Sequence, residues 1–290
     1  GLGSAQLSRA MLMHTNLSRA FLYGANLSYA KLDRANFTNA ELTKANLQGA
    51  SLVGATLVGA QLSGAILSGV NLRAADLQGV NLCGADLRGI NLRSANLRGA
   101  NLSWTNLTGA KLSGAQLEGA SLFGTQLNQA FLNGVDFQNF DLDGVNLTQA
   151  KLSGANFAGT NLSAANLSAT QLRVANLIRA NLHAANLTAA DLRRSDLREA
   201  NLSKADLTHA DLTEADMTGA VLNAASLYAT NLAGASLHSA YLWGAKLIAT
   251  NLFRANLTKT SLRGAMMEDV NQREAVLTEA VLPDGSVVHA

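Results

Sequence analysis

Leucine recurs at every fifth residue of this 290-residue chain, from Leu2 to Leu282, and no insertion shifts the register. The series has 57 positions, and only six of them hold another residue: Phe37, Phe137, Phe157, Met217, Met267 and Gln272. A small residue stands two places before the leucine, where 40 of 56 positions are alanine. The residue between them is mostly polar. The chain is therefore a run of quintets, each made of a small residue, a polar residue, leucine and two further residues.

Neither regular secondary structure accommodates this period. In an α-helix a step of five residues rotates the side chain by roughly 140°, so successive leucines would form no apolar stripe. In a flat strand an odd step sends consecutive leucines to opposite faces. Both conflicts disappear if the chain turns a corner once per quintet. The small residue and the leucine then point inward from a short edge, and the two following residues make the bend.

The bend residues support this interpretation. Glycine is frequent at the second of the two, as at Gly49 and Gly54. A type II turn requires a positive φ at that place, which glycine adopts without steric cost. Where the place holds Arg, Lys or Asn instead, we expect a different type of turn.

A chain that keeps bending in one sense forms a solenoid whose coils stack about 4.8 Å apart, with the inward columns as a continuous core. The period alone leaves the number of edges per coil open, since three or five edges satisfy the same argument.

The quintets resemble the pentapeptide-repeat family. Units such as Ala25-Asn26-Leu27-Ser28-Tyr29 and Ala205-Asp206-Leu207-Thr208-His209 match its pattern, and the match covers nearly the whole chain. The resemblance implies an all-β fold, a right-handed quadrilateral β-helix with four quintets per coil, and hence about 14 coils in a rod of roughly 65–70 Å at the sheet spacing. The closing Leu282-Pro283-Asp284-Gly285-Ser286 is similar to the end of many cyanobacterial members.

We expect a single elongated domain. Residues 1–265 form the β-helix, and residues 266–290, where Gln272 interrupts the leucine series, form an irregular last coil and a cap of the same domain. The first residues already follow the repeat without a cap. Rod-to-rod stacking through that end, or an upstream domain, is therefore expected, because an open sheet edge invites pairing.

The composition indicates in which cellular compartment the protein is located and whether it enters a membrane or forms a disulfide. Net charge is +2, from 22 basic and 20 acidic residues. No apolar run approaches the roughly 18–20 residues that cross a bilayer, and no signal peptide is visible. The single cysteine, Cys83, excludes an intrachain disulfide and fits a reducing compartment. We place the protein in the cytoplasm, with the periplasm and the thylakoid lumen as alternatives, and expect no membrane insertion.

Two arginine clusters follow from stacking residues twenty apart. Arg73 stacks on Arg93, and Arg173 stacks on Arg193 beside Arg194. A basic stripe contacts phosphate or an acidic partner. Acidic residues lie within both clusters, however, and mixed-sign charge is typical of a solvated, partly neutralised face. We expect no specific binding of nucleic acid.

Catalytic, metal and cofactor sites are not predicted. Asp191 stacks over Asp211, which is reminiscent of a glycosidase carboxylate pair, but a convex surface offers no cleft for a substrate. The five histidines are scattered over different coils and corners, and Cys83 lies five coils from His183. No zinc site can be assembled from that spacing.

Outward aromatic residues are the better candidates for binding a protein, because aromatic anchors are typical of interfaces. We expect Trp104 and Phe123 on one corner of adjacent coils, Tyr241 and Trp243 on the same edge further along, and Phe131 pointing outward before a leucine. A few single exposed aromatic residues are normal on any surface.

The sequence therefore favours a non-catalytic interaction or scaffold module with an unknown protein partner. One alternative is a DNA mimic that protects a type II topoisomerase, as the resemblance implies for some members, although a net charge of +2 disfavours it. Another alternative is the soluble domain of a larger, membrane-anchored protein.

Overall fold

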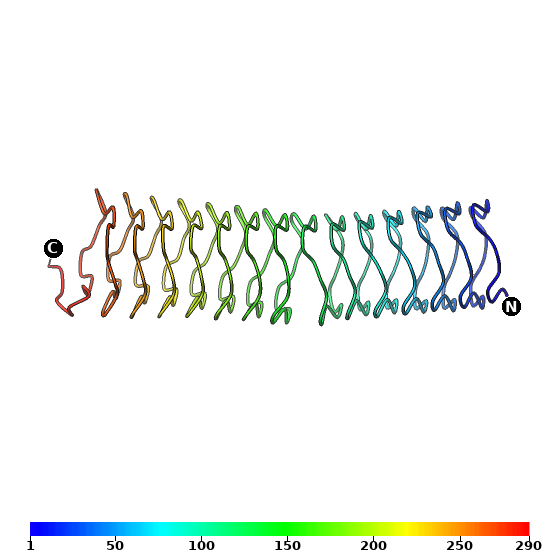
Figure 1. The fold of residues 1–290 in the computed structure, drawn as a ribbon, viewed down its shortest axis with the longest axis horizontal. Helices are drawn as coiled ribbons and strands as arrows, with labels where there is room; N and C mark the ends of the chain where they lie inside the picture. The colour runs from blue at the N-terminus through cyan, green and yellow to red at the C-terminus, as the bar shows by residue number, and fades with distance from the viewer. Residues whose placement is uncertain (290) are drawn as a thin grey trace. The chain divides into compact units, whose positions relative to one another are not determined.

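The computed structural model describes residues 1–289. It divides into two compact units, Gly1–Asp136 and Phe137–Ala290, which we call unit 1 and unit 2 and describe separately. Each unit is a stack of coils, unit 1 running from blue to green in Figure 1 and unit 2 from green to red. Among residues 1–289 there is no helix, and the sheet consists of single bridge residues, one per quintet.

The coil has four edges, as the family resemblance implies. The residue before each leucine forms parallel bridges with its equivalents twenty residues earlier and later, as Asn46 does with Asn26 and Ile66. Such bridges run from Gln6 to Phe131 in unit 1 and continue in the same step through unit 2 from Asp141. Twenty residues contain four quintets, so neither three nor five edges describes these coils.

The quintet pairs every main-chain N–H group between residues 26 and 30. Asn26 N donates to the previous coil at 2.9 Å, and the leucine and the second bend residue donate to the next coil at 2.7 and 2.8 Å. The small residue closes the bend onto the leucine carbonyl at 3.1 Å. The remaining N–H, that of Ser28, donates to the side-chain Oδ1 of Asn26 at 3.1 Å. This explains why Asn and Asp precede the leucine so often: their side chains satisfy the one donor that stacking leaves unpaired.

The second bend residue has a positive φ whatever its side chain. Gly54 has φ of 63°, and Asn39, Lys44 and Trp104 have 55°, 58° and 61°. The positive φ expected of glycine therefore occurs at Arg, Lys and Asn as well, whereas another type of turn at these residues stays a prediction. In a bend such as Ser28-Tyr29, the C=O of the first residue and the N–H of the second pair with the two neighbouring coils. That pairing imposes the left-handed conformation at a cost of about 1–2 kcal/mol for a non-glycine residue.

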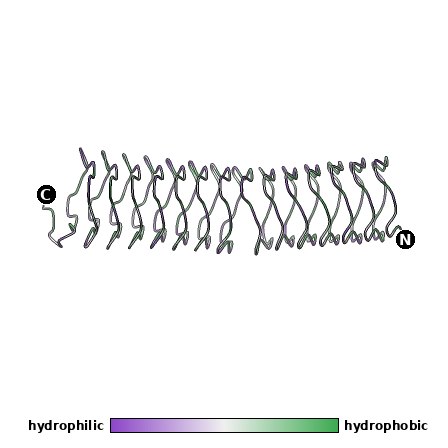
Figure 2. Cartoon of the chain, in the orientation of Figure 1, coloured by the Kyte–Doolittle hydropathy of each residue, from purple (hydrophilic) through white to green (hydrophobic). Residues whose placement is uncertain are grey.

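The core of each unit is a leucine column beside a column of small residues. In unit 1 the leucine-series side chains from Leu22 to Leu132 are at most 5% exposed, and in unit 2 the same holds from Phe137 to Leu262. Hydrophobic and hydrophilic residues therefore alternate along every coil (Figure 2). Buried threonines in the small-residue column donate to main-chain carbonyls, as Thr260 does to Leu237 O at 2.6 Å.

The last residues of unit 2 turn back on themselves. Val281 forms an antiparallel bridge with Val287, and Leu282 N donates to Ser286 O at 2.8 Å. Pro283 lies in the reversal, where its fixed φ fits, and Asp284 accepts hydrogen bonds from the N–H and the hydroxyl of Ser286. This hairpin occupies the outer side of the final edge with main-chain partners, which is how sheet edges are commonly protected.

Candidate protein-interaction surfaces

Trp104 and Phe123 form an exposed aromatic pair on one corner of unit 1. Their ring centroids lie 5.0 Å apart with the planes at 90°, and the residues are 63% and 66% exposed. The main chain fixes this proximity, because Trp104 N donates to Phe123 O at 2.8 Å. The indole also lies over Gly124, where a β-carbon would come within 2.5 Å of Trp104 Cε3. The sequence prediction that these two residues share a corner is in accord with this geometry.

The edge and corner that hold the pair carry no charge from residue 60 to residue 124. On the edge and corner of residues 60–64, 80–84, 100–104 and 120–124, the outward side chains are glutamine, asparagine, serine, cysteine, glycine and the two aromatic residues. Among them, Asn101 Nδ2 donates to Asn81 Oδ1 at 3.3 Å. Cys83 is half-buried on the same corner, one coil before Trp104. We call this surface the aromatic face.

The other predicted aromatic residues lie elsewhere on the two units. Phe131 is half-buried and bridges to Lys111 on a different edge of unit 1. Tyr241 and Trp243 are 54% and 61% exposed on one edge and corner of unit 2. No ring contact joins those two within residues 1–289.

An additional aromatic cluster in the first coils was missed by the sequence analysis. Phe21 and Tyr23 stack with centroids 6.3 Å apart, and Lys44 Nζ lies 6.0 Å from the Tyr23 ring centre. The signal was present in the sequence, because residues two apart on an edge and its corner point to the same side. Tyr23 also shares its corner with Phe123.

The predicted arginines divide into a paired and an unpaired group. In unit 2, Arg193 forms two hydrogen bonds with Asp191, at 2.8 and 2.6 Å, and Arg194 pairs with Glu214 at 2.6 Å. In unit 1, Arg73 and Arg93 stack, and neither forms an ion pair within the described part of the chain. The neutralised-face interpretation thus holds for Arg193 and Arg194 but not for Arg73 and Arg93.

The stacked aspartates of unit 2 both form ion pairs with one arginine, Arg193. Asp191 and Asp211 occupy adjacent bridge positions, as predicted, and Arg193 Nε lies 3.5 Å from Asp211 in addition to its bonds with Asp191. The hydrogen bond from Arg193 lowers the pKa of Asp191. A glycosidase acid requires the opposite, a carboxyl with a raised pKa. Arg173, stacked on Arg193, adds to the lowering of the Asp191 pKa.

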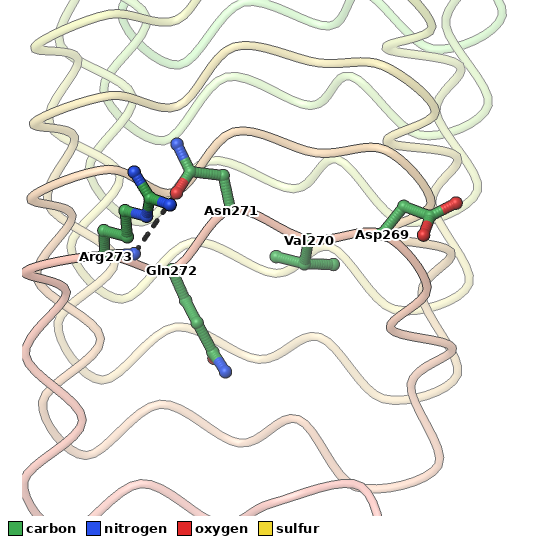
Figure 3. A pocket seen from close by; sticks show the side chains of 5 residues that line it. All are labelled: Asp269, Val270, Asn271, Gln272 and Arg273. Carbon is green, nitrogen blue, oxygen red and sulfur yellow. Dashed lines mark hydrogen bonds between the residues drawn. The ribbon is translucent and has the colours of Figure 1, made fainter.

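A hollow of about 600 Å³ lies near the end of unit 2, lined by residues 269–273. Figure 3 shows the side chains that line it, Val270 and Gln272 among them, and the hydrogen bond from Arg273 N to Asn271 Oδ1. The hollow forms where Gln272, an exposed side chain, replaces a core leucine. It is open to solvent, because Asp269, Gln272 and Arg273 are all exposed, and it lacks the apolar enclosure typical of small-molecule sites.

Two further findings bear on chemistry. Within residues 1–289, no three His, Cys, Asp or Glu side chains gather closely enough to hold a metal ion. No helix long and apolar enough to cross a bilayer occurs in that same part of the chain.

Comparisons with known proteins agree with the quintet fold. The family model for pentapeptide repeats, which describes eight copies, matches in overlapping segments that together cover residues 2–139 and 141–271. No curated protein matches the chain.

Solved structures of this family are similar to the chain. HetL, a pentapeptide repeat protein involved in heterocyst differentiation regulation in the cyanobacterium Nostoc sp. strain PCC 7120, is 33% identical over 86% of this chain and 92% of HetL, with a TM-score of 0.52. Rfr23 of the cyanobacterium Cyanothece 51142 is 40% identical over 34% of this chain and 62% of its own, with a TM-score of 0.22. QnrB1, a plasmid-mediated fluoroquinolone resistance protein, is 23% identical over 73% of this chain and 92% of its own, with a TM-score of 0.41.

The family fold is a right-handed quadrilateral β-helix, in agreement with the twenty-residue step of the bridges. Its members are generally structural or interaction modules. The unbroken quintets, the four-edged coils and the extent of both matches lead to one conclusion: this chain belongs to the pentapeptide repeat family.

Proposed function

We propose that the chain is a non-catalytic interaction module that binds a protein partner on the aromatic face of unit 1, with Trp104 and Phe123 as the anchor. The observation that carries the proposal is the exposed edge-to-face contact of these rings at 5.0 Å. Aromatic residues contribute most of the binding energy in many interfaces, because each buries a large area and has few rotamers to lose.

The anchor is held in place before binding. The backbone of Trp104 donates to Phe123 O, and the indole rests where Gly124 lacks a side chain. Each immobilised side chain costs about 0.5–1.5 kcal/mol of conformational entropy on binding, and a preformed pair avoids part of that cost. The surrounding amides and hydroxyls carry no charge that a partner would have to desolvate.

Quantitative affinity capture tests the proposal. The full chain is immobilised, incubated with cyanobacterial lysate, and the bound proteins are compared by mass spectrometry with those on the W104A/F123A variant. We expect a defined protein to be retained by the native chain and lost from the variant. The Y241A/W243A variant, which removes an equally exposed pair in unit 2, is the matched control and keeps the partner. Retention by W104A/F123A would reject the anchor.

A topoisomerase-protecting DNA mimic is the weaker alternative. Such a mimic presents a dense array of negative charge, as a DNA duplex does. Unit 1 has ten basic and six acidic side chains, and several of the carboxylates of unit 2 pair with arginine. A gyrase supercoiling assay at micromolar protein decides the point: protection against a gyrase inhibitor would favour the mimic over the interaction module.

We also propose about 14 coils for the whole chain, since each coil contains four quintets.

We propose that the protein is located in the cytoplasm, with the half-buried free thiol of Cys83 as the supporting observation. Fractionation of the native cells tests the compartment, and recovery of the protein from the periplasm or thylakoid lumen would overturn it.

A further inference from the structure

The net charge of unit 1 lies on one side of its coils. Of its ten basic and six acidic residues, five basic residues and one acidic residue occupy one edge of the coils and the corner that follows it. The bridge residues of this edge run from Lys31 to Lys111 in steps of twenty. We call this surface the basic strip. Its charged residues are Lys31, Arg34, Arg73, Arg93 and Lys111, with Asp33 as the acidic one. The rest of unit 1 carries five charges of each sign, so the net charge of unit 1, which is +4, lies entirely on the strip.

These cations are accessible and unpaired. Lys31, Arg34, Arg73 and Arg93 are exposed and Lys111 is half-buried, and none forms an ion pair within residues 1–289.

The nearby carboxylates are engaged elsewhere. Asp33 Oδ1 accepts hydrogen bonds from the Ser51 hydroxyl and from Val53 N. Asp76, on the next edge, accepts from Asn96 Nδ2 at 2.9 Å and forms no ion pair with Arg73 among the described residues.

At several other corners this chain pairs a cation with a glutamate twenty residues later. Five such pairs occur, with N···O distances of 2.6–3.7 Å: Arg98–Glu118, Arg179–Glu199, Arg194–Glu214, Arg254–Glu274 and Lys259–Glu279. On the strip the equivalent positions are different, because Arg34 is followed by Gly54, Arg73 by Arg93, and Arg93 by Ser113. The arginines of the strip therefore have no glutamate partner of this kind.

From this charge distribution we infer a second binding site: the basic strip docks an acidic segment of a partner polypeptide. From Lys31 to Lys111 the cations extend over four coil steps, roughly 19 Å at the sheet spacing. Short polar side chains such as Ser94 and Ser113 lie between them and leave the surface open. An extended acidic peptide presents alternate side chains on one side roughly every 6.6 Å. Its carboxylates can therefore reach the flexible cations of the three successive coils that hold Arg73, Arg93 and Lys111, and those of Lys31 and Arg34 beyond the uncharged coil of Ser51.

A polypeptide fits the strip better than a nucleic acid does. Proteins that bind single strands stack bases on aromatic side chains. The strip has none between residues 31 and 114, and Phe131, which follows Lys111 on the same edge, is half-buried. Duplex DNA carries a charge about every 1.7 Å, which is far denser than five cations over roughly 19 Å. The strip corner is also diagonally opposite the corner of Trp104, so that one coil stack can hold two partners at once.

Fluorescence anisotropy tests the strip with a defined probe. A rhodamine-labelled peptide of about eight glutamates, roughly 26 Å when extended, is titrated with the full chain at low salt. We expect saturable binding that weakens about tenfold in R73Q/R93Q/K111Q and weakens further as salt rises, because exposed charges are screened. The control variant R179Q/R194Q/R254Q removes the same number of charges from paired positions and keeps the native affinity.

Three results would overturn the inference. These are the absence of an anisotropy change at low salt, an equal loss of affinity in the control variant, and tighter binding of a labelled oligo-dT of equal length. The first would show that the strip does not bind acidic peptides. The second would show that the peptide is attracted by the overall charge alone, and the third would assign the strip to nucleic acid. Thermal unfolding of both variants shows that the coils are intact. The aromatic anchor is untouched in these variants, so the outcome is independent of the proposed function.

Discussion

The indole of Trp104 occupies the space above Gly124, one coil further on, where a β-carbon would lie 2.5 Å from the ring. A methyl group at position 124 therefore has to displace the indole from Phe123. We predict that G124A weakens partner capture nearly as much as W104A/F123A does, although both rings remain in the chain.

Gly84→Ala is the control for that variant. Gly84 shares the corner with Gly124 and has the same φ of 67°, but a β-carbon there meets nothing within 4 Å. Both substitutions cost about 1 kcal/mol of backbone strain, so equal stability with unequal capture isolates the indole. If G84A and G124A capture the partner equally well, the position of the ring over Gly124 has no part in binding.

Non-glycine residues with a positive φ at the second bend position are sites where substitution by glycine can stabilise the protein. Val174 is β-branched, 62% exposed and has φ of 56°, a conformation that such residues rarely adopt. We predict that V174G raises the free energy of unfolding by about 1 kcal/mol, because strain is relieved and little packing is lost. Chemical denaturation of both proteins measures the change.

The reverse substitution lies one coil away. Gly154 has φ of 67° and open space around it, so G154V imposes the same strain without a clash. It should destabilise by a similar amount, and a neutral result for either variant would show that the corner conformation carries no strain.

How much of this structure follows from the sequence depends on the kind of interaction. Coiling and the inward columns follow from the period of five, and the neighbouring positions of Trp104 and Phe123 follow once the family resemblance supplies four quintets per coil. The positive φ at Lys44 was not predicted, because hydrogen bonds between coils override the preference of a single residue. The position of the Trp104 indole over Gly124 depends on the side-chain rotamer of Trp104, which no periodic pattern specifies.

Ion pairing was in part predictable. A cation followed by glutamate twenty residues later, as in Arg194 and Glu214, is visible in the sequence once the coil length is known. The paired state of Arg193 is harder to predict, since the guanidinium reaches back to Asp191 within its own quintet as well as across to Asp211.

Hydroxyl groups in the small-residue column contribute hydrogen bonds to the core. Thr260 is fully buried and donates to Leu237 O, whereas valine occupies the same column at Val70 and Val80 without steric difficulty. We predict that T260V lowers the free energy of unfolding by about 1 kcal/mol, the usual contribution of one hydrogen bond. Urea denaturation measures it, and an unchanged or more stable variant would contradict the assignment.

Acid should weaken unit 2 through its ion pairs. The pKa of Asp191 is lowered by the hydrogen bond from Arg193, so this carboxylate stabilises the fold above its unfolded pKa of about 3.9. That contribution is lost as pH falls through the lower folded pKa. We predict that D191N, which keeps the Oδ1 acceptor for Arg193 N, loses less thermal stability than the native chain between neutral and acidic pH. An equal loss would show that the pair is not coupled to folding.

Site-specific photo-crosslinking in the native cell tests the central claim most directly. A photoreactive phenylalanine analogue replaces Phe123 of unit 1 in one strain. In a second strain it replaces Val174, which is exposed on a corner of unit 2. The account predicts a discrete crosslinked protein from position 123 and none from position 174. The same products from both positions, or no product from position 123, would contradict an interaction site on the aromatic face.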